Sequence, residues 1–112
     1  MPIPLHQAKA ELFRTLGHPV RIRVLELLQD GPRPVHELLD EIDVEPSNLS
    51  HQLAVLRRAG IVASTRESSA VLYSLGTNDV ADLMIAARRL LTDVLSDQQT
   101  LLAELRATGP RG

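Results

Sequence analysis

The chain has 112 residues, a net charge of −2 and no cysteine. We expect a chain of this length to form a single domain, residues 1–112, with a modest core. The lack of cysteine excludes disulfides and thiolate metal sites, and the net acidity argues against a protein that coats nucleic acid indiscriminately. No apolar run reaches the roughly 18 residues that a membrane-spanning helix needs. We therefore expect a soluble, cytoplasmic protein with no membrane partner and no bound cofactor.

Two helices are predicted in the first quarter of the chain. One Phe and one Tyr are the only aromatic residues, so the core must come mainly from aliphatic side chains, which favours packed helices. Apolar residues at helical spacing predict a first helix over 5–16, and Gly17 ends it. Pro19 fits the first turn of a second, densely apolar helix that runs to residue 29. We interpret His18, between the two, as a cap or a solvent-exposed group rather than a metal ligand.

A helix-turn-helix is predicted over residues 34–60. A turn at 30–33 precedes Pro34, which opens a short helix. The core positions of this helix are Val35, Leu38, Leu39 and Ile42. A tight link at 43–45 then leads to a helix of about a dozen residues, as in DNA-binding helix-turn-helix proteins. On pattern alone, a helical hairpin without DNA binding is an equally good interpretation.

The second helix of this pair combines a buried stripe with a polar face. Pro46 suits its first turn, and Gly60 suits the left-handed residue that follows a helix. The apolar positions i, i+4 and i+7 are Leu49, Leu53 and Leu56. This spacing turns Ser47, His51 and Arg58 outward. The pattern therefore fits a DNA-reading helix, and the alternative is an ordinary amphipathic surface helix.

The charge around this helix favours DNA. Residues 46–66 contain no Asp or Glu, whereas Arg57, Arg58 and Arg66 supply positive charge suited to phosphate.

A β-hairpin is predicted after Gly60. Residues 61–66 and 71–75 are β-prone and are separated by a four-residue loop, 67–70. A lone hairpin is marginally stable, so it must pack against the helices, where it forms a wing beside the DNA-reading helix. Arg66 is then placed either to reach a phosphate or to lie solvated on the hairpin edge.

A long last helix is predicted over 78–106, with Thr77 or Asn78 as its cap. Its apolar arc is wider than one small domain can cover, which predicts a symmetric homodimer through this helix. The interface residues predicted on it are Val80, Met84, Ala87, Leu91 and Val94. A capping-box pattern leaves open a restart or kink near Ser96. Residues 108–112 are expected to fray.

Three motifs in this order resemble the arsenic-repressor (ArsR/SmtB) family of winged-helix transcription regulators. They are LGHPVRIRVLELL at 16–28, SNLSHQLAVLRRAGIV at 47–62 and VLYSL at 71–75. The resemblance implies a mainly α fold with a small β-hairpin: a winged helix-turn-helix of about five helices and a two-stranded wing. It also implies a homodimer joined through the first and last helices, with Leu5 and Leu12 in the interface, that binds an inverted-repeat operator and represses transcription. No enzymatic activity is predicted, because Ser47, Ser50 and His51 lie on one helix with no acid there to orient the histidine and no glycine-rich loop nearby.

The resemblance assigns a DNA-facing group to the recognition helix and the wing. Its members are Ser47, Asn48, Ser50, His51, Gln52, Arg57, Arg58 and Arg66. Asn and Gln side chains suit the N6 and N7 of adenine. By helical angle, however, Gln52 lies beside the leucine stripe, and the alternative is that it buttresses the helix.

The metal sites of the family are not matched. Its thiolate segment corresponds to Pro34-Val35-His36-Glu37, and its last-helix site corresponds to Thr77, Asp79, Leu90 and Asp93. Leucine binds no metal, and two carboxylates without imidazole do not form the usual zinc or nickel set. We therefore predict no metal at these sites, and the effector is open. The remaining alternatives are a metal-responsive repressor with a different site and a winged-helix protein-interaction module.

Overall fold

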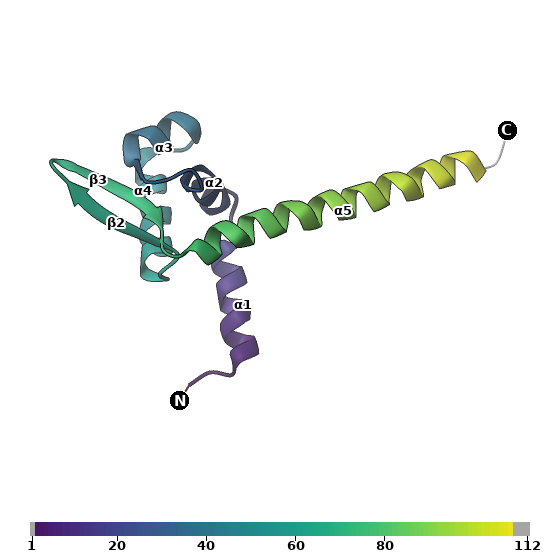
Figure 1. Ribbon diagram of the computed structural model, residues 1–112, viewed down its shortest axis with the longest axis horizontal. Coiled ribbons are helices and arrows are strands. Elements are labelled where there is room, and N and C mark those ends of the chain that lie inside the picture. Colours follow the sequence, from purple (N-terminus) through teal and green to yellow (C-terminus); the bar gives the residue numbers. More distant parts are fainter. Residues whose placement is uncertain (1, 109–112) are drawn as a thin grey trace. The chain divides into compact units, whose positions relative to one another are not determined.

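The computed structural model describes residues 2–108 and divides the chain into two compact units after Ala81. The elements are α1 (Leu5–Leu16), α2 (Pro19–Leu28), β1 (Arg33–Pro34), α3 (Val35–Glu41), α4 (Pro46–Arg58), β2 (Val62–Glu67), β3 (Ala70–Leu75) and α5 (Asn78–Thr108) (Figure 1). This order confirms the predicted winged helix-turn-helix of five helices.

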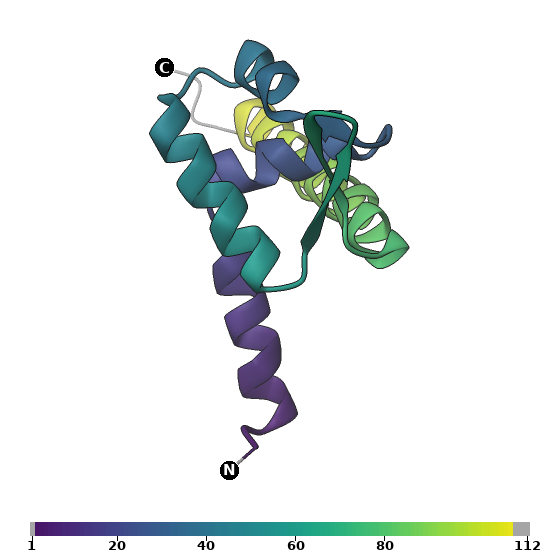
Figure 2. The same cartoon turned by 90° about the vertical axis from the view of Figure 1, so that its left-hand side faces the viewer.

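The core of the first unit is built from aliphatic side chains of α2, α3 and α4. Its fully buried members are Val24, Leu25, Leu28, Leu38, Leu49, Leu53 and Leu56. Helix α2 packs against α4 and β3, and α3 packs against β1 and β3. Figure 2 shows this unit with the hairpin beside α4. The predicted leucine stripe of α4 is thus the part of that helix which seats it on the rest of the unit.

Local signals fix the ends of these helices. His18 caps α2, because its Nδ1 accepts a hydrogen bond from the Val20 N–H at 3.2 Å. Pro46 occupies the first turn of α4, and Gly60 has a φ of 77°, the left-handed conformation that follows a helix. The predicted cap and both predicted ends are confirmed.

The wing has one strand more than predicted. The sheet order is β1-β3-β2, and β1 pairs antiparallel with β3 through Arg33↔Tyr73 and Pro34↔Leu72. The predicted hairpin is present, but Glu67 pairs with Ala70, so its loop has two residues rather than four. Ser68 begins that loop with a φ of 54°. A two-residue edge strand carries no period that sequence reasoning can detect, and Pro34 is tolerated there because it lies at a sheet edge.

Gly76 closes the base of the wing. Its N–H donates to the carbonyl of Ile61 at 2.8 Å. A Cβ at this position would lie 2.3 Å from the carbonyl oxygen of Gly60. Only glycine therefore allows the chain leaving β3 to approach the chain entering β2 so closely.

The second unit consists of most of α5. This helix has 31 residues and runs without interruption through Ser96, so the helix neither restarts nor ends there. The Thr100 hydroxyl donates to the Ser96 carbonyl at 3.0 Å, one turn back along the helix. Its last described residue is Thr108, and the rest of the tail predicted to fray, 109–112, lies outside the described residues. In residues 2–108 no helix is both long enough and apolar enough to cross a membrane.

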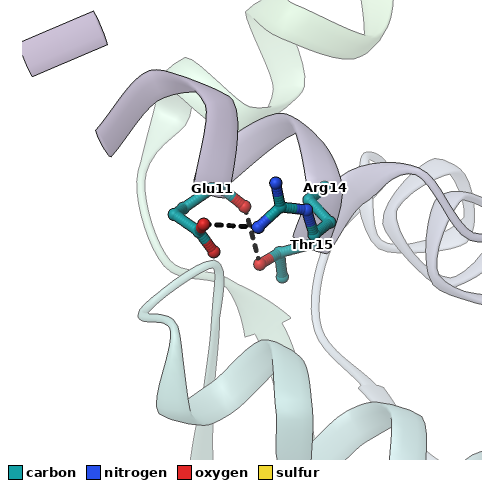
Figure 3. Close-up of polar contacts among 3 residues, drawn as sticks. All are labelled: Glu11, Arg14 and Thr15. Carbon is teal, nitrogen blue, oxygen red and sulfur yellow. Dashed lines mark hydrogen bonds and ion pairs between the residues drawn. The ribbon is translucent and has the colours of Figure 1, made fainter. Parts of the chain in front are cut away.

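Helix α1 carries exposed apolar residues beside a polar network. Every residue from 5 to 14 is exposed, including Phe13 at 58%. Figure 3 shows the Arg14 guanidinium paired with the Glu11 carboxylate, and the Thr15 hydroxyl donating to the Glu11 carbonyl at 3.0 Å. Such solvent-exposed pairs contribute little stability, so the apolar side chains are the feature of α1 that calls for explanation.

Candidate nucleic-acid interface

The N-terminal half of α4 presents small polar side chains to solvent. Ser47, Asn48, Ser50 and His51 are all exposed, while Leu49 and Leu53 of the same helix are at most 1% exposed. Because the leucines hold one side of the helix in the core, the polar side chains are held on the other. These groups can donate and accept hydrogen bonds without carrying a negative charge.

The first turn of α4 also leaves backbone donors open. Glu45 precedes the helix, and no side chain caps the N–H groups there. The first turn holds no acidic residue. Free N–H groups at a helix start favour an anion such as a phosphate.

The arginines predicted to contact phosphate are accessible. Arg57 and Arg58 lie in the last turn of α4, and Arg66 lies in β2; all three are exposed. The Arg58 Nε donates to the Ala54 carbonyl at 3.3 Å, which still leaves the terminal nitrogens of that side chain for another partner.

Gln52 does not belong to the exposed group. It is 6% exposed, and both ends of its amide are engaged within the protein. Its Oε1 accepts from the Arg21 Nε at 2.7 Å, and its Nε2 donates to the Asn48 Oδ1 at 2.9 Å. The structure thus places Gln52 inside, as the buttressing alternative expected, and moves it out of the predicted DNA-facing group.

Sequence reasoning missed Arg21. Its Nε holds Gln52, and one of its terminal nitrogens donates to the Thr15 carbonyl at the end of α1, at 3.0 Å. Arg21 and Gln52 are 31 positions apart, so no helical spacing connects them. The one available signal was the position of Arg21 inside the motif at 16–28.

The predicted dimer residues differ in exposure within one chain. Leu5, Leu12, Leu91 and Val94 are 69%, 40%, 60% and 41% exposed, and Ala87 is also exposed. Val80 is half-buried, and Met84 is 8% exposed. Five of the seven predicted residues are thus exposed in the single chain.

No cluster in residues 2–108 brings together three His, Asp or Glu side chains able to hold a metal ion. His36 and Glu37, two of the residues that the family resemblance aligns with a thiolate segment, are both exposed on α3.

Comparisons with known proteins agree with this geometry. A family described as a helix-turn-helix domain matches residues 16–65. The chain is 52% identical over 107 residues to the HTH-type transcriptional regulator Rv0081 of Mycobacterium tuberculosis strain H37Rv, covering 95% of this chain and 94% of that protein. The crystal structure of Rv0081 matches with a TM-score of 0.80, over 87% of this chain and 98% of the other.

Two further solved structures are similar. The transcriptional repressor BigR from Xylella fastidiosa matches with a TM-score of 0.70 at 35% identity, over 76% of this chain and 87% of that one. The homodimeric winged helix-turn-helix DNA-binding domain of Mb0332 from Mycobacterium bovis, a possible ArsR-family transcriptional regulator, matches with a TM-score of 0.75 at 25% identity. That match covers 83% of this chain and 86% of the other.

Proposed function

The chain belongs to the ArsR/SmtB family of winged helix-turn-helix transcriptional regulators, and on this premise we propose that it represses transcription by binding an inverted-repeat operator as a homodimer. As a DNA-binding regulator rather than an enzyme, it acts by occupying DNA. Relatives named as repressors, including BigR, support repression rather than activation of transcription. We propose the cytoplasm as its compartment, which cell fractionation would test.

The exposed acid-free face of α4 is the observation that carries this proposal. Ser47, Ser50 and His51 are accessible, and the leucines behind them are buried. A helix with this division can enter a major groove with its N-terminal residues against the base edges. Serine can serve a base donor or acceptor, and the imidazole of His51 can donate to guanine or phosphate.

The arginines have a different proposed role. Arg57, Arg58 and Arg66 lie at the far end of α4 and in the wing, where a guanidinium meets the sugar-phosphate backbone rather than the bases. Such contacts position the protein on any duplex and make binding sensitive to salt.

Exposed apolar surface supports the homodimer. Six leucines of α5 are 46–65% exposed in the single chain, and Leu5, Leu12 and Phe13 of α1 are 40–69% exposed. A second copy can cover self-complementary patches of this kind. In such a dimer the two α4 helices would enter successive major grooves about 34 Å apart.

A DNA titration tests the proposal. The protein is titrated against its own promoter region and against random duplex of equal length, at several salt concentrations. We expect preference for the promoter and binding that weakens as salt rises. Equal affinity for both duplexes at moderate salt would refute sequence-specific regulation, and a dimer with no salt-dependent DNA binding would indicate a protein-interaction module instead.

Substitutions separate the two kinds of contact. Ser47→Ala or His51→Ala should reduce the preference for the promoter by roughly 1 to 3 kcal/mol, with the exposed Ser96→Ala and His36→Ala as matched controls. Arg58→Ala should weaken binding to promoter and random duplex alike, with Arg89→Ala as its control. Equal losses on all duplexes for Ser47→Ala and His51→Ala would show that these residues contact only the backbone.

A further inference from the structure

Two side-chain hydrogen bonds link Arg21 of α2 to Asn48 on the proposed DNA surface, and Gln52 lies between them. Arg21 carries N–H donors and no acceptor. The Gln52 atom 2.7 Å from its Nε must therefore be the amide oxygen, because an NH₂ group there would face another donor. Gln52 is 6% exposed, so water cannot readily replace a bond lost by rotating this amide.

The orientation of the Gln52 amide in turn determines the orientation of the Asn48 amide. With its oxygen toward Arg21, Gln52 turns its Nε2 toward Asn48, 2.9 Å from the side-chain oxygen. A rotated Asn48 amide would again place two NH₂ groups face to face. The Asn48 Oδ1 is thus held toward the protein, and within residues 2–108 no hydrogen bond from its Nδ2 to a protein acceptor is found.

We propose that Arg21, acting through Gln52, orients the Asn48 amide as a hydrogen-bond donor toward DNA, so that Asn48 selects an acceptor on a base edge. The inference rests on the proposed DNA-binding role of α4. Asn48 is exposed in the first turn of that helix, the part that contacts bases when a recognition helix enters the major groove. Arg21 and Gln52 are positioning residues, and Asn48 is the residue that touches DNA.

The orientation changes the base that Asn48 prefers. An asparagine free to use both ends of its amide pairs with the N6 and N7 of adenine. With its oxygen occupied, Asn48 favours edges that only accept, which are the O6 and N7 of guanine and the O4 of thymine. Cytosine presents the N4 donor and is the least suitable base.

Gln52→Glu is the decisive substitution, because it preserves shape and reverses polarity. A carboxylate keeps the bond to Arg21 and strengthens it through charge. Its second oxygen, however, accepts and does not donate. The Asn48 amide must then rotate to donate its Nδ2 inward, which turns its oxygen toward the DNA. Gln29→Glu adds the same charge at an exposed position near the end of α2 and is the matched control.

The test measures base preference at each operator position. Selection from a randomised duplex library, followed by titration of single-base variants, is performed on the unmodified protein, Asn48→Ala, Gln52→Glu and Gln29→Glu. At one position in each half-site we expect guanine or thymine to be favoured over cytosine by about fivefold or more. Asn48→Ala should abolish this preference only there, Gln52→Glu should reverse it toward adenine or cytosine, and Gln29→Glu should retain it.

Arg21→Met tests whether Arg21 sets this orientation. Methionine keeps the apolar part of the side chain but has no N–H donor, so we expect the preference at the same position to flatten while the other positions keep theirs. Arg23→Met, two residues along α2 and exposed, is its control. Melting temperatures of all variants show that each is folded before its base preference is interpreted.

Three results of the DNA experiments would overturn the inference. Gln52→Glu could keep the original base preference, Arg21→Met could leave it unchanged, or Asn48→Ala could weaken all duplexes equally, as a phosphate contact would. NMR of the free protein keeps the orientation testable without DNA. The Asn48 NH₂ protons should exchange quickly with water in the unmodified protein and become protected in Gln52→Glu; unchanged exchange would refute the orientation. If the unmodified protein shows no sequence preference at all, the proposed function fails, and these NMR signals still decide the orientation.

Discussion

Helices α4 and α5 are both amphipathic, yet a single chain buries the apolar stripe of α4 and leaves most leucines of α5 exposed. The stripe of α4 is at most 1% exposed at Leu49, Leu53 and Leu56, whereas Leu90 and Leu91 of α5 are 65% and 60% exposed. The seating of α4 is therefore determined within the protomer, by leucines on its buried side and by Arg21 through Gln52. The apolar residues of α5 are left exposed in the single chain, and we propose that a second copy covers them.

This difference separates two requirements of a DNA-reading dimer. The angle at which α4 presents its polar face depends on packing contacts that lie within one copy. The distance between two such faces depends on the contact between copies. Substitutions in the buried stripe of α4 should consequently lower the stability of the protomer, whereas substitutions on the exposed apolar face of α5 should weaken association of the dimer.

The largest loss of stability is expected for Leu53→Ala in α4. Truncating a leucine that is 1% exposed removes buried apolar surface and leaves a cavity, so the free energy of unfolding should fall by about 2 to 5 kcal/mol. Urea unfolding measures the loss. Ile3→Ala, at a residue that is 55% exposed and outside the proposed interface, is the control, and a loss there as large as that for Leu53→Ala would contradict the assigned core.

The next effect is expected for Gly76→Ala at the base of the wing. The new Cβ would lie 2.3 Å from the backbone carbonyl oxygen of Gly60, which cannot move aside as the end of a flexible side chain could. By analogy with overpacked cores we expect a loss of about 1 to 3 kcal/mol, measured by thermal unfolding. Ala70→Gly, the reverse exchange at the tip of the wing, is the control. An unchanged melting temperature for Gly76→Ala would refute the close approach of Gly76 to the Gly60 carbonyl.

Leu91→Ala should weaken the dimer and leave the protomer folded. Its side chain is 60% exposed in one chain, and losing its burial against a second copy should cost about 1 to 2 kcal/mol of association. Sedimentation equilibrium would reveal this as a roughly tenfold higher dissociation constant. An unaltered dimer would remove Leu91 from the proposed interface.

The smallest effect is expected for Arg14→Ala. Its ion pair with Glu11 joins side chains that are 71% and 60% exposed, and pairs of this kind contribute at most about 1 kcal/mol. Urea unfolding should change by less than about 0.5 kcal/mol. A larger change would mean that the polar side of α1 has a partner beyond Glu11.

Strong local patterns allowed most of the fold to be predicted from the sequence. The bounds of α1, the proline start of α4 and the left-handed Gly60 follow from residues within a few positions of each other. The apolar period of α4 and its buried stripe are likewise local properties. These features depend little on the rest of the molecule, which is why the sequence sufficed.

The features that escaped prediction depend on distant partners. Strand β1 has two residues and exists because β3, almost forty positions later, pairs with it. The wing loop was expected to be longer because nothing in Ser68-Ser69 signals the left-handed φ that Ser68 adopts. For the candidate site, the exposed polar residues of α4 were predictable, but the bond from Arg21 that turns Gln52 inward was not.

Changing the spacing of the half-sites shows whether two paired copies bind the operator through their α4 helices, because such binding requires both the DNA-reading face of α4 and a fixed distance between the copies. Once an inverted-repeat operator has been selected, five base pairs are inserted between its half-sites, which moves one half-site by about half a helical turn. We predict that affinity falls close to that for random duplex and that a ten-base-pair insertion restores part of it. Unchanged affinity after the five-base-pair insertion would contradict a dimer that presents two fixed recognition helices.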